Sequence, residues 1–288
     1  MTRGTARVLR TIDVQTISDA IENIAVEACC KLSSDTLEAL RRARDSERSP
    51  IGKEVLDTLL ENAAIAEREM VPICQDTGVA VVFVEMGDQV RVQGASLVEA
   101  IEEGVRRGYS RGNLRKSIVA DPFDRVNTGD NTPPVIHVEL RHGNELSIAF
   151  LAKGGGCENA SFLGMLQPGD GWQGVLEFVA DGVIEKAPNS CPPVIVGVGI
   201  GGTTEKAAII AKKSLLRPLD QPHPDPEIAK LESALLGRIN DSGIGPGAFG
   251  GTVTALAVHV ETHSCHIASL PVAVNLECHA HRHRKITL

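Results

Sequence analysis

The spacing of apolar residues changes near Gly78, and this change argues against a purely helical or a purely β fold. Residues 13–70 repeat apolar side chains at three- and four-residue intervals, as amphipathic helices do. Residues 79–86 (VAVVFVEM) then form an apolar run typical of a strand. We therefore predict a mixed α/β (α+β) fold, with a helical N-terminal region over 13–70 followed by an interlocked α/β body with small sheets over 71–288, in a single domain.

Further elements are expected along the body. A helix should follow Ser96, a residue suited to capping its first turn. Residues 134–140 and 145–152 flank the turn RHGN like the two strands of a β-hairpin. A buried strand at 194–200 precedes a Gly-rich turn and a helix. Residues 218–226 hold four prolines and should form a rigid connector inside the body, without marking a domain boundary.

Composition and charge indicate which kinds of partner the chain is expected to bind. The 288 residues are 42% hydrophobic, enough for a sizeable core. The net charge is -8, and the C-terminal segment HAHRHRK (279–285) is the one basic block, so we expect no nucleic-acid partner. No apolar run could span a membrane, and residues 1–15 lack the apolar segment of a signal peptide. We expect a cytoplasmic protein with no membrane contact.

The glycine-rich sequence GVGIGG (197–202) lies between an expected strand and an expected helix, as phosphate-binding loops do. A dinucleotide site would also need an acid at a strand end about 20 residues later, whereas Asp220 falls in the proline-rich connector. Glycines that permit close packing of the strand on the helix are the favoured interpretation. An anion at the helix start, Thr203 and Thr204, remains an alternative.

The seven cysteines are too few for a disulfide scaffold of this length. Cys29 and Cys30 fit a helical pattern and should be small buried apolar residues. The other cysteines stand beside Gly, Pro, His or Asp, and none forms the closely spaced pair of a structural zinc site, although Cys265 stands near His263 and His266. These other cysteines are Cys74, Cys157, Cys191, Cys265 and Cys278.

Thiolates from separate loops can instead hold an iron–sulfur cluster. Three thiolates leave one iron with an open position, which can act as a Lewis acid on a hydroxyl and a carboxylate. Polar neighbours of a ligand, such as Gln75 and Asp76 beside Cys74, would then face a substrate. The alternative is a set of buried thiols near tight turns.

Six motifs in order raise the cluster hypothesis: CQDTG, LRKSIVADP, DNTPPVIHVE, AKGGGCEN, CPPVIVGVGIGGTTEKA and HIASLPVAVNLECHAHRH. Together they resemble the class I fumarase family over about residues 70–285. The resemblance is to the alpha subunit of two-subunit fumarate hydratases or L(+)-tartrate dehydratases. It implies an oxygen-sensitive 4Fe-4S cluster with three cysteine ligands and one open iron site.

The resemblance also implies roles for individual residues. Cys74, Cys191 and Cys278 match the cluster ligands. Cys157 matches a position that can be serine in related sequences, so it is expected to be a neighbour of the cluster, with a ligand role as the alternative. Cys265 has no place in the ligand set. The substrate would contact four residues, with Asp76 as the acid for the departing oxygen: Gln75, Asp76, Arg115 and the backbone of Gly156.

Three further positions belong to the same comparison. His266 matches an active-site histidine of the family. Lys153 is a weaker candidate with a structural role as its alternative. His279 is expected in the surroundings of the cluster, and the rest of the HAHRHRK tail to be solvated or to face another subunit.

The implied reaction is the reversible addition of water to a four-carbon dicarboxylate. Fumarate giving (S)-malate is favoured, and L(+)-tartrate giving oxaloacetate and the methylated mesaconate are alternatives. In single-chain relatives the catalytic base comes from a C-terminal domain, and this sequence ends at Leu288, so we expect a separate beta subunit in an alpha2beta2 assembly. A redox or iron-sensing cluster protein, and a non-catalytic assembly subunit, are the alternatives from other classes.

Overall fold

The computed structural model describes residues 9–288, which its internal contacts divide into two compact units. Unit 1 contains the residues up to Lys31, Glu69–Lys153 and Arg282–Leu288, and unit 2 contains Leu32–Arg68 and Gly154–His281. The expectation of a single domain stays a prediction. The expectation that residues 1–15 are not a signal peptide falls partly on residues 1–8, which lie outside the described part of the chain.

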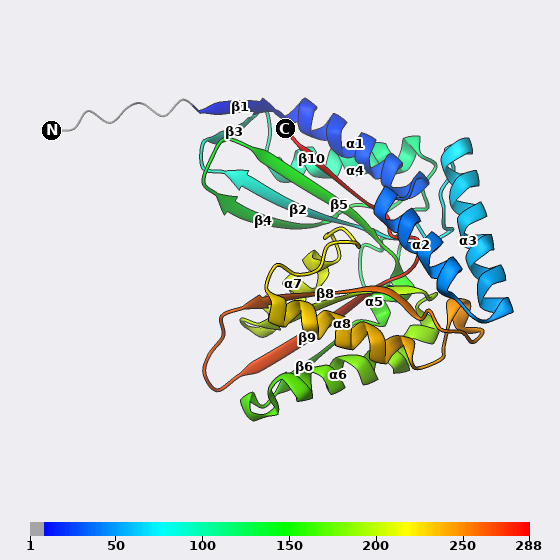
Figure 1. Cartoon of the computed structure of the whole chain (residues 1–288). Coiled ribbons are helices and arrows are strands. Elements are labelled where there is room, and N and C mark those ends of the chain that lie inside the picture. Colours follow the sequence, from blue (N-terminus) through cyan, green and yellow to red (C-terminus); the bar gives the residue numbers. More distant parts are fainter. Residues whose placement is uncertain (1–8) are drawn as a thin grey trace. The chain divides into compact units, whose positions relative to one another are not determined.

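A four-stranded sheet and two helices form unit 1 (Figure 1). The sheet has the order β10-β5-β2-β4, with strands β2 (Val79–Gly87), β4 (Val135–Arg141), β5 (Leu146–Lys153) and β10 (His283–Thr287). Strand β1 (Arg10–Asp13) pairs in parallel with β3 (Val90–Gln93). The helices α1 (Val14–Cys30) and α4 (Leu97–Arg111) share a buried core with the sheet that includes Ile21, Val82, Ile101 and Phe150.

Local sequence sets both helices of unit 1. The Asp13 side chain accepts a hydrogen bond from the Gln15 backbone N–H at the start of α1. Ser96 and Glu99 form a reciprocal capping box at the start of α4, which confirms Ser96 as its cap. Gly104 lets α4 approach α1, because a Cβ there would lie 2.5 Å from the Ile21 Cβ. The apolar stripes of two amphipathic helices thereby meet over the sheet.

The hairpin expected around RHGN is wrong. Strand β2 lies between β4 and β5: Val82 pairs with Ile136 in parallel and with Phe150 in the antiparallel direction. The RHGN segment instead passes the end of β2, where the Gly87 N–H donates to Glu145 O and the Gln89 N–H donates to Gly143 O. The residue pattern predicted both strands correctly. It carries no information on whether another strand lies between them in the sheet.

Unit 2 holds a second four-stranded sheet, in the order β6-β9-β7-β8 (Figure 1). Its strands are β6 (Phe162–Leu166), β7 (Val194–Gly201), β8 (Ala255–His263) and β9 (Leu270–Glu277). Its helices are α2 (Ser34–Ser46), α3 (Pro50–Glu69, all but its last residue), α5 (Gly155–Asn159), α6 (Gly171–Lys186), α7 (Thr204–Ser214) and α8 (Pro226–Asn240). The expected N-terminal helices are therefore confirmed, although they are shared between the two units.

The glycines of β7 allow helix α7 to pack directly on the strand. A Cβ at Gly197 would lie 2.2 Å from Ala211 O, and one at Gly199 would lie 2.1 Å from Ala207 O. Real Cβ atoms do not come so close to a carbonyl oxygen, so both positions require glycine. The packing interpretation of GVGIGG is thus confirmed.

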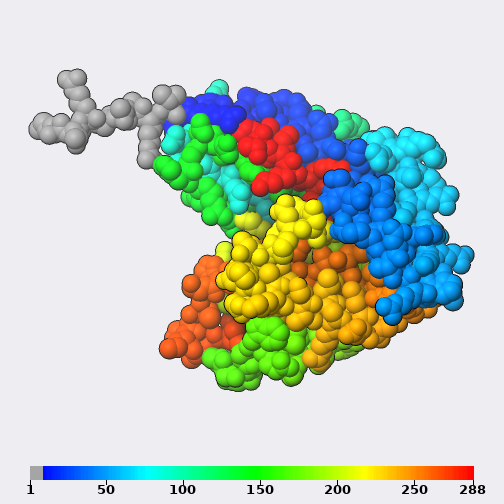
Figure 2. Space-filling view, in the orientation of Figure 1, coloured from blue at the N-terminus to red at the C-terminus, as the bar shows by residue number. Residues whose placement is uncertain are grey.

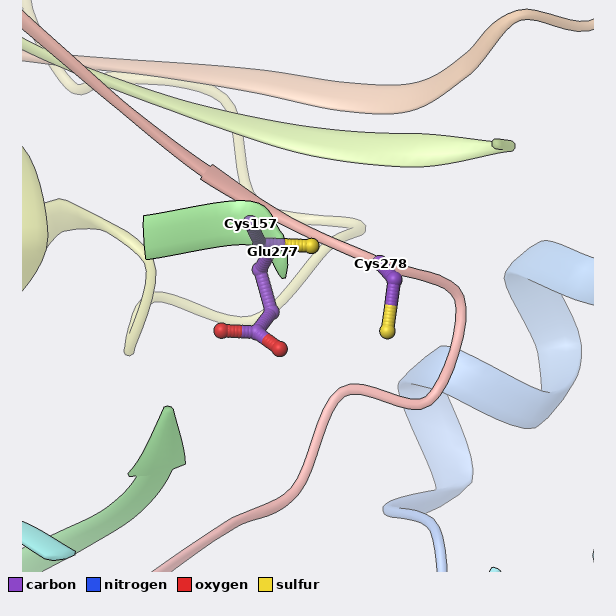
Figure 3. Close-up of side chains that lie close together, drawn as sticks. All are labelled: Cys157, Glu277 and Cys278. Atoms are coloured by element: carbon purple, nitrogen blue, oxygen red, sulfur yellow. The ribbon is translucent and has the colours of Figure 1, made fainter. Parts of the chain in front are cut away.

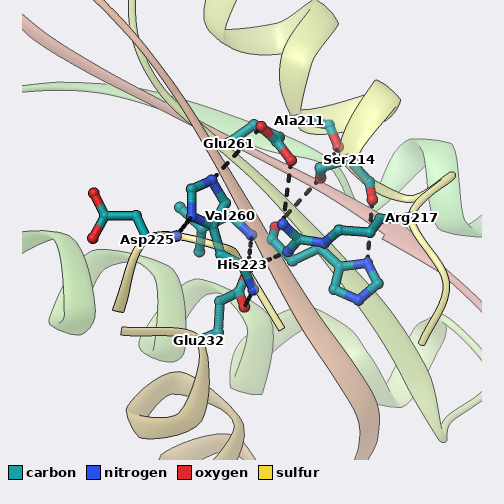
Figure 4. A network of polar contacts seen from close by, with 9 residues as sticks. Ala211, Ser214, Arg217, His223, Asp225, Glu232, Val260 and Glu261 are labelled. Atoms are coloured by element: carbon teal, nitrogen blue, oxygen red, sulfur yellow. Dashed lines mark hydrogen bonds and ion pairs between the residues drawn. The ribbon is translucent and has the colours of Figure 1, made fainter. Parts of the chain in front are cut away.

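The proline-rich connector is fixed within unit 2 by a network of charges (Figure 4). Arg217 forms an ion pair with Glu232 of α8, and its Nη1 lies 3.3 Å from Glu261 of β8. Glu232 also accepts backbone N–H groups of His223, at 2.9 Å, and of Val260, at 2.8 Å. These contacts attach the connector to both elements, as expected of a segment inside the body.

The interpretation of the C-terminal tail as a solvated or subunit-facing end is wrong for residues 280–282, which are buried, whereas Lys285 is exposed. His281 and Arg282 are fully buried, and residues 283–287 form the edge strand β10, paired with β5. Figures 1 and 2 show β10, in red, beside α1 in unit 1. The basic composition concealed a strand whose neighbours lie far away in sequence. No helix within residues 9–288 is both long and apolar enough to cross a membrane.

Candidate functional site

The CQDTG motif of unit 1 is a tight turn that leads into β2. The Gly78 N–H donates to Asp76 Oδ1 at 3.0 Å, and Gly78 adopts a φ of 71°. Glycine suits this left-handed conformation, and an aspartate two residues earlier suits the side-chain turn. The turn orients the Asp76 carboxyl group and leaves Gln75 exposed at its tip.

Buried side chains support this turn from inside unit 1. The Tyr109 hydroxyl lies 2.8 Å from Thr77 O and donates to it, and the Arg282 guanidinium donates to Asp76 O. Burial raises the pKa of Tyr109 well above its ordinary value, so the phenol stays a donor. Just before the motif, the Ile73 N–H donates to Cys29 O at 2.9 Å. The backbone on either side of Cys74 is thereby held in place.

Cys29 and Cys30 are fully buried, as expected of small apolar residues. Burial raises the pKa of the Cys29 thiol to about 12. Cys29 is therefore a neutral thiol at physiological pH.

The LRKS segment is joined to the same corner of unit 1. The Thr77 hydroxyl donates to Arg115 O at 3.0 Å. The fully buried Asn131 accepts from the Ser117 N–H at 2.7 Å and donates to Gly78 O at 3.2 Å. The structure therefore brings the exposed Arg115 close to the CQDTG turn, together with the predicted substrate residues Gln75 and Asp76.

In unit 2, the loops of two expected cluster ligands meet. The Nδ1 atom of His279 lies 3.0 Å from Cys191 O, and His279 follows Cys278 directly. The Cys157 thiol donates to Ser190 O at 3.4 Å, next to Cys191. Cys191 itself is exposed and has a φ of 53°, a conformation that is uncommon outside glycine and marks functional sites more often than chance. The two loops that carry Cys191 and Cys278 and the helix that carries Cys157 thus converge.

A closer group lies within this convergence (Figure 3). The Sγ atoms of Cys157 and Cys278 and a carboxylate oxygen of Glu277 all lie within 4.8 Å of one another, and all three residues are buried. Cys157 is therefore a direct neighbour of the expected ligand Cys278. Its ligand role stays an untested alternative.

The thiol loops suit the donor chemistry of an iron–sulfur cluster. Such clusters take cysteine thiolates from separate loops, and unit 2 supplies Cys191 and Cys278 from loops joined by a hydrogen bond. Cys74, the third expected ligand, belongs to unit 1. The thiol donors and the fixed backbone around them are both compatible with the cofactor.

His266 lies elsewhere in unit 2. It is exposed in the turn between β8 and β9, and its Nδ1 accepts the Ala268 N–H at 3.1 Å. The eight-residue strand β9 separates it from Cys278, a distance of roughly 23 Å along the strand. Within unit 2, His266 is therefore not brought to the thiol loops.

His266 instead lines a cavity of about 620 Å³ at the start of α7. Its lining includes the two threonines considered for an anion, Thr203 and Thr204, and also Lys206 and His263. Thr203 is the residue before the first turn of α7, as expected for a helix start. Within unit 2, this cavity is distinct from the thiol loops.

The two remaining expected residues lie near the motifs that suggested them. Gly156 is in α5, and a Cβ there would meet only Asn189 O, at the ordinary contact distance of 3.7 Å. Packing within the chain therefore does not require a glycine at 156. Lys153 is buried at the end of β5, in register with Val79 beside the CQDTG turn.

Three residues were not anticipated from the sequence. Asn131 was inside a recognised motif, and its left-handed φ of 64° fits an asparagine. Glu277 directly precedes an expected ligand, so its acidic side chain in an apolar strand was an available signal. Arg282 was hidden in the basic tail, and nothing local marked it as buried.

Comparison with known proteins identifies the family of this chain and several relatives. The sequence model of the family described as fumarate hydratase (Fumerase) matches residues 18–287. The chain is 41% identical over 272 residues to the putative L(+)-tartrate dehydratase subunit alpha of Methanocaldococcus jannaschii, covering 92% of this chain and 95% of the relative. It is 33% identical over 273 residues to L(+)-tartrate dehydratase subunit alpha of Escherichia coli K12, covering 93% and 89%.

Proposed function

The chain belongs to the fumarate hydratase (Fumerase) family and is a hydro-lyase acting on a dicarboxylate, and from this premise we propose that it is the alpha subunit of an L(+)-tartrate dehydratase. The observation that carries the choice of substrate is the name shared by the relatives at 33–41% identity, which cover about nine-tenths of the chain. This choice differs from the fumarate favoured by the sequence. Fumarate remains the second candidate, because the family description names it.

Cys74, Cys191 and Cys278 are the proposed ligands of a 4Fe-4S cluster. The hydrogen bond between the Cys191 and Cys278 loops supports two members of this set. When bound, the cluster would supply an iron with an open position, a Lewis acid for a substrate hydroxyl and carboxylate. Cys157 would remain a neighbouring thiol.

Gln75, Asp76 and Arg115 are the proposed substrate-binding residues. Arg115 would pair with a substrate carboxylate, because its planar guanidinium can donate two parallel hydrogen bonds. The Gly78 N–H donates to Asp76 Oδ1, and this fixed position supports the proposal that the carboxyl group would give a proton to the departing hydroxyl. The proximity of the LRKS segment to the CQDTG turn supports a common role for these three residues.

Gly156 and His266 complete the proposed set. The backbone of Gly156 would contact the substrate, and a glycine not required by packing within the chain is compatible with that role. His266 would act in the assembled enzyme as a second catalytic residue. Its exposure at the β8–β9 turn leaves it available to a ligand or to another chain.

A beta subunit is the proposed partner, in an alpha2beta2 assembly. The relatives carry the name subunit alpha, which supports a second chain. The base that acts on the substrate carbon opposite the departing hydroxyl would come from that subunit. The chain alone should then hold a cluster yet lack turnover.

The test is an anaerobic assay of the chain, with and without its beta subunit, on L-tartrate, fumarate and mesaconate. We expect turnover only with the pair, and the highest kcat/KM on L-tartrate. Arg115→Lys should raise KM, whereas Arg125→Lys, a change of another exposed arginine in unit 1, should not. Turnover of fumarate above L-tartrate would replace the proposed substrate, and full turnover by the chain alone would refute the need for a partner.

A further inference from the structure

Unit 2 contains a group of potential metal-binding atoms that shares only Cys278 with the proposed cluster ligands. Cys157 from α5 and the consecutive Glu277 and Cys278 at the end of β9 place two Sγ atoms and a carboxylate oxygen within 4.8 Å of one another (Figure 3). Within residues 9–288 this is the one group of three or more His, Cys, Asp or Glu side chains so arranged. We propose that the cluster-free chain binds a single zinc-like divalent ion through these three side chains.

The separations of the three atoms fit such an ion. A tetrahedral zinc site with bonds of roughly 2.0–2.3 Å places its ligand atoms roughly 3.3–3.8 Å apart. The limit of 4.8 Å is about 1 Å larger, a difference that small side-chain rotations can close. Water would complete a four-coordinate site. All three ligand residues come from one unit, so the site is complete within unit 2.

The local structure holds the two elements of the site together. Asn275 of β9 donates to Ser161 Oγ, two residues after the end of α5, at 2.8 Å. It also donates to Glu158 Oε2, within α5, at 3.3 Å. Glu158 is also paired with Lys212 of α7, at 2.6 Å. Cys157 and Cys278 are therefore carried by backbones that are already fixed, which lowers the cost of ordering a metal site.

The donor set selects the kind of ion. Two thiolates and one carboxylate suit Zn²⁺ and Co²⁺, whereas Mg²⁺ and Ca²⁺ prefer oxygen ligands alone. Three anionic donors also balance the charge of a buried dication better than an apolar pocket could. The exposed Cys265, by contrast, lies in the β8–β9 turn and is no part of this group.

One consequence rests on the cluster ligands given under the proposed function. Cys278 belongs to both sets, so an ion held by Cys157, Glu277 and Cys278 would occupy a thiolate that the cluster needs. Binding of the ion and assembly of the cluster should then exclude each other. The ion-binding site itself does not depend on the enzyme activity.

The experiment is a titration of the full-length, reduced, cluster-free chain with Co²⁺ under argon, followed by thiolate-to-cobalt charge-transfer absorption. We expect saturation at one equivalent, displacement by Zn²⁺ and no displacement by excess Mg²⁺. Cys157→Ser and Cys278→Ser should abolish the tight site, and Glu277→Gln should weaken it roughly tenfold or more. Cys74→Ser, Cys191→Ser and Cys265→Ser are the matched controls and should bind as the wild type does.

Absence of the charge-transfer band at one equivalent would overturn the proposal, as would a band that survives Cys157→Ser and is lost in Cys74→Ser or Cys191→Ser. If Cys157→Ser does not fold, X-ray absorption of the wild-type cobalt complex decides: two sulfur ligands support the site and three refute it. Preloading with Zn²⁺ should lower iron uptake by the wild type but not by Cys157→Ser. Equal uptake would refute mutual exclusion, and none of these readouts depends on turnover.

Discussion

His279 Nδ1 lies 3.0 Å from the carbonyl oxygen of Cys191, and this contact joins the loop of one proposed cluster ligand to the residue that follows another, Cys278. The imidazole lies outside the proposed ligand set. The hydrogen bond connects the two loops through the backbone, and the proposed ligands on these loops, Cys191 and Cys278, are 87 positions apart in sequence.

We therefore predict that His279→Ala lowers retention of the cluster. Losing a residue that positions metal ligands typically costs 10- to 100-fold in affinity. Iron released to a chelator under anaerobic conditions measures the effect. His279→Asn keeps a short donor and should retain more iron than His279→Ala, whereas equal retention by all three proteins would show that the contact has no positioning role.

A second prediction concerns Asn131, which connects the CQDTG turn to the LRKS segment. Asn131→Ala removes one buried and one partly buried hydrogen bond of a fully buried side chain, so the free energy of unfolding should fall by about 2–3 kcal/mol. Asn127→Ala is the control, because Asn127 also makes two hydrogen bonds but is exposed. Urea unfolding should show a cost below about 1 kcal/mol for the control. Similar costs for the two variants would contradict the role given to burial.

The pH dependence of stability should report on His259 in the β8 strand. Burial lowers its pKa from 6.5 to about 4, while its Nδ1–H donates to Ser214 O. The folded chain then keeps His259 neutral where the unfolded chain binds a proton, so stability is lost as pH falls from about 6.5 to 4. The loss should approach about 3 kcal/mol, at roughly 1.4 kcal/mol per pH unit.

His259→Gln should remove this part of the pH dependence while leaving the part due to carboxyl groups. Urea unfolding of both proteins at several pH values in that window measures the difference. His142→Gln is the control, because His142 is an exposed histidine in another unit. A slope between pH 6.5 and 4 that is unchanged in His259→Gln would contradict the assignment.

The contact between β7 and α7 gives a fourth prediction. Gly199→Ala places a methyl group 2.1 Å from Ala207 O and should cost about 3 kcal/mol or more of unfolding free energy. Gly237→Ala, in helix α8, meets no atom within 4 Å and should instead raise stability by about 0.5–1 kcal/mol. Thermal unfolding of the two variants measures opposite shifts in Tm. A neutral Gly199→Ala would show that α7 can move away from the strand.

Patterns that depend on near neighbours in sequence were read correctly. The helix periods of 13–70, the Ser96 cap and the glycines of β7 each follow from a few adjacent residues. The order of strands did not follow, because pairing β2 between β4 and β5 depends on contacts far apart in the chain. The prediction for the C-terminal tail was wrong for the same reason, because β10 forms a strand by pairing with β5, which is far away in sequence.

In the candidate site, too, features set by adjacent residues were predicted and contacts between distant residues were not. The motifs located the cysteine loops and the corner around Asp76. They did not reveal that Asn131 joins that corner, or that Glu277 lies beside Cys157, because both relationships depend on where side chains point after folding. A single acidic or amide side chain has no sequence periodicity. The sequence therefore does not indicate whether such a side chain is buried and supports the fold or is exposed.

The most direct test of the central proposal is the iron and sulfide content of the anaerobically reconstituted chain and its single cysteine variants. The three-cysteine ligand set predicts about four irons per chain for the wild type and for Cys157→Ser. It predicts a loss of most cluster iron and sulfide in Cys74→Ser, Cys191→Ser and Cys278→Ser. A cluster that is lost in Cys157→Ser and retained in any one of those three variants would contradict it.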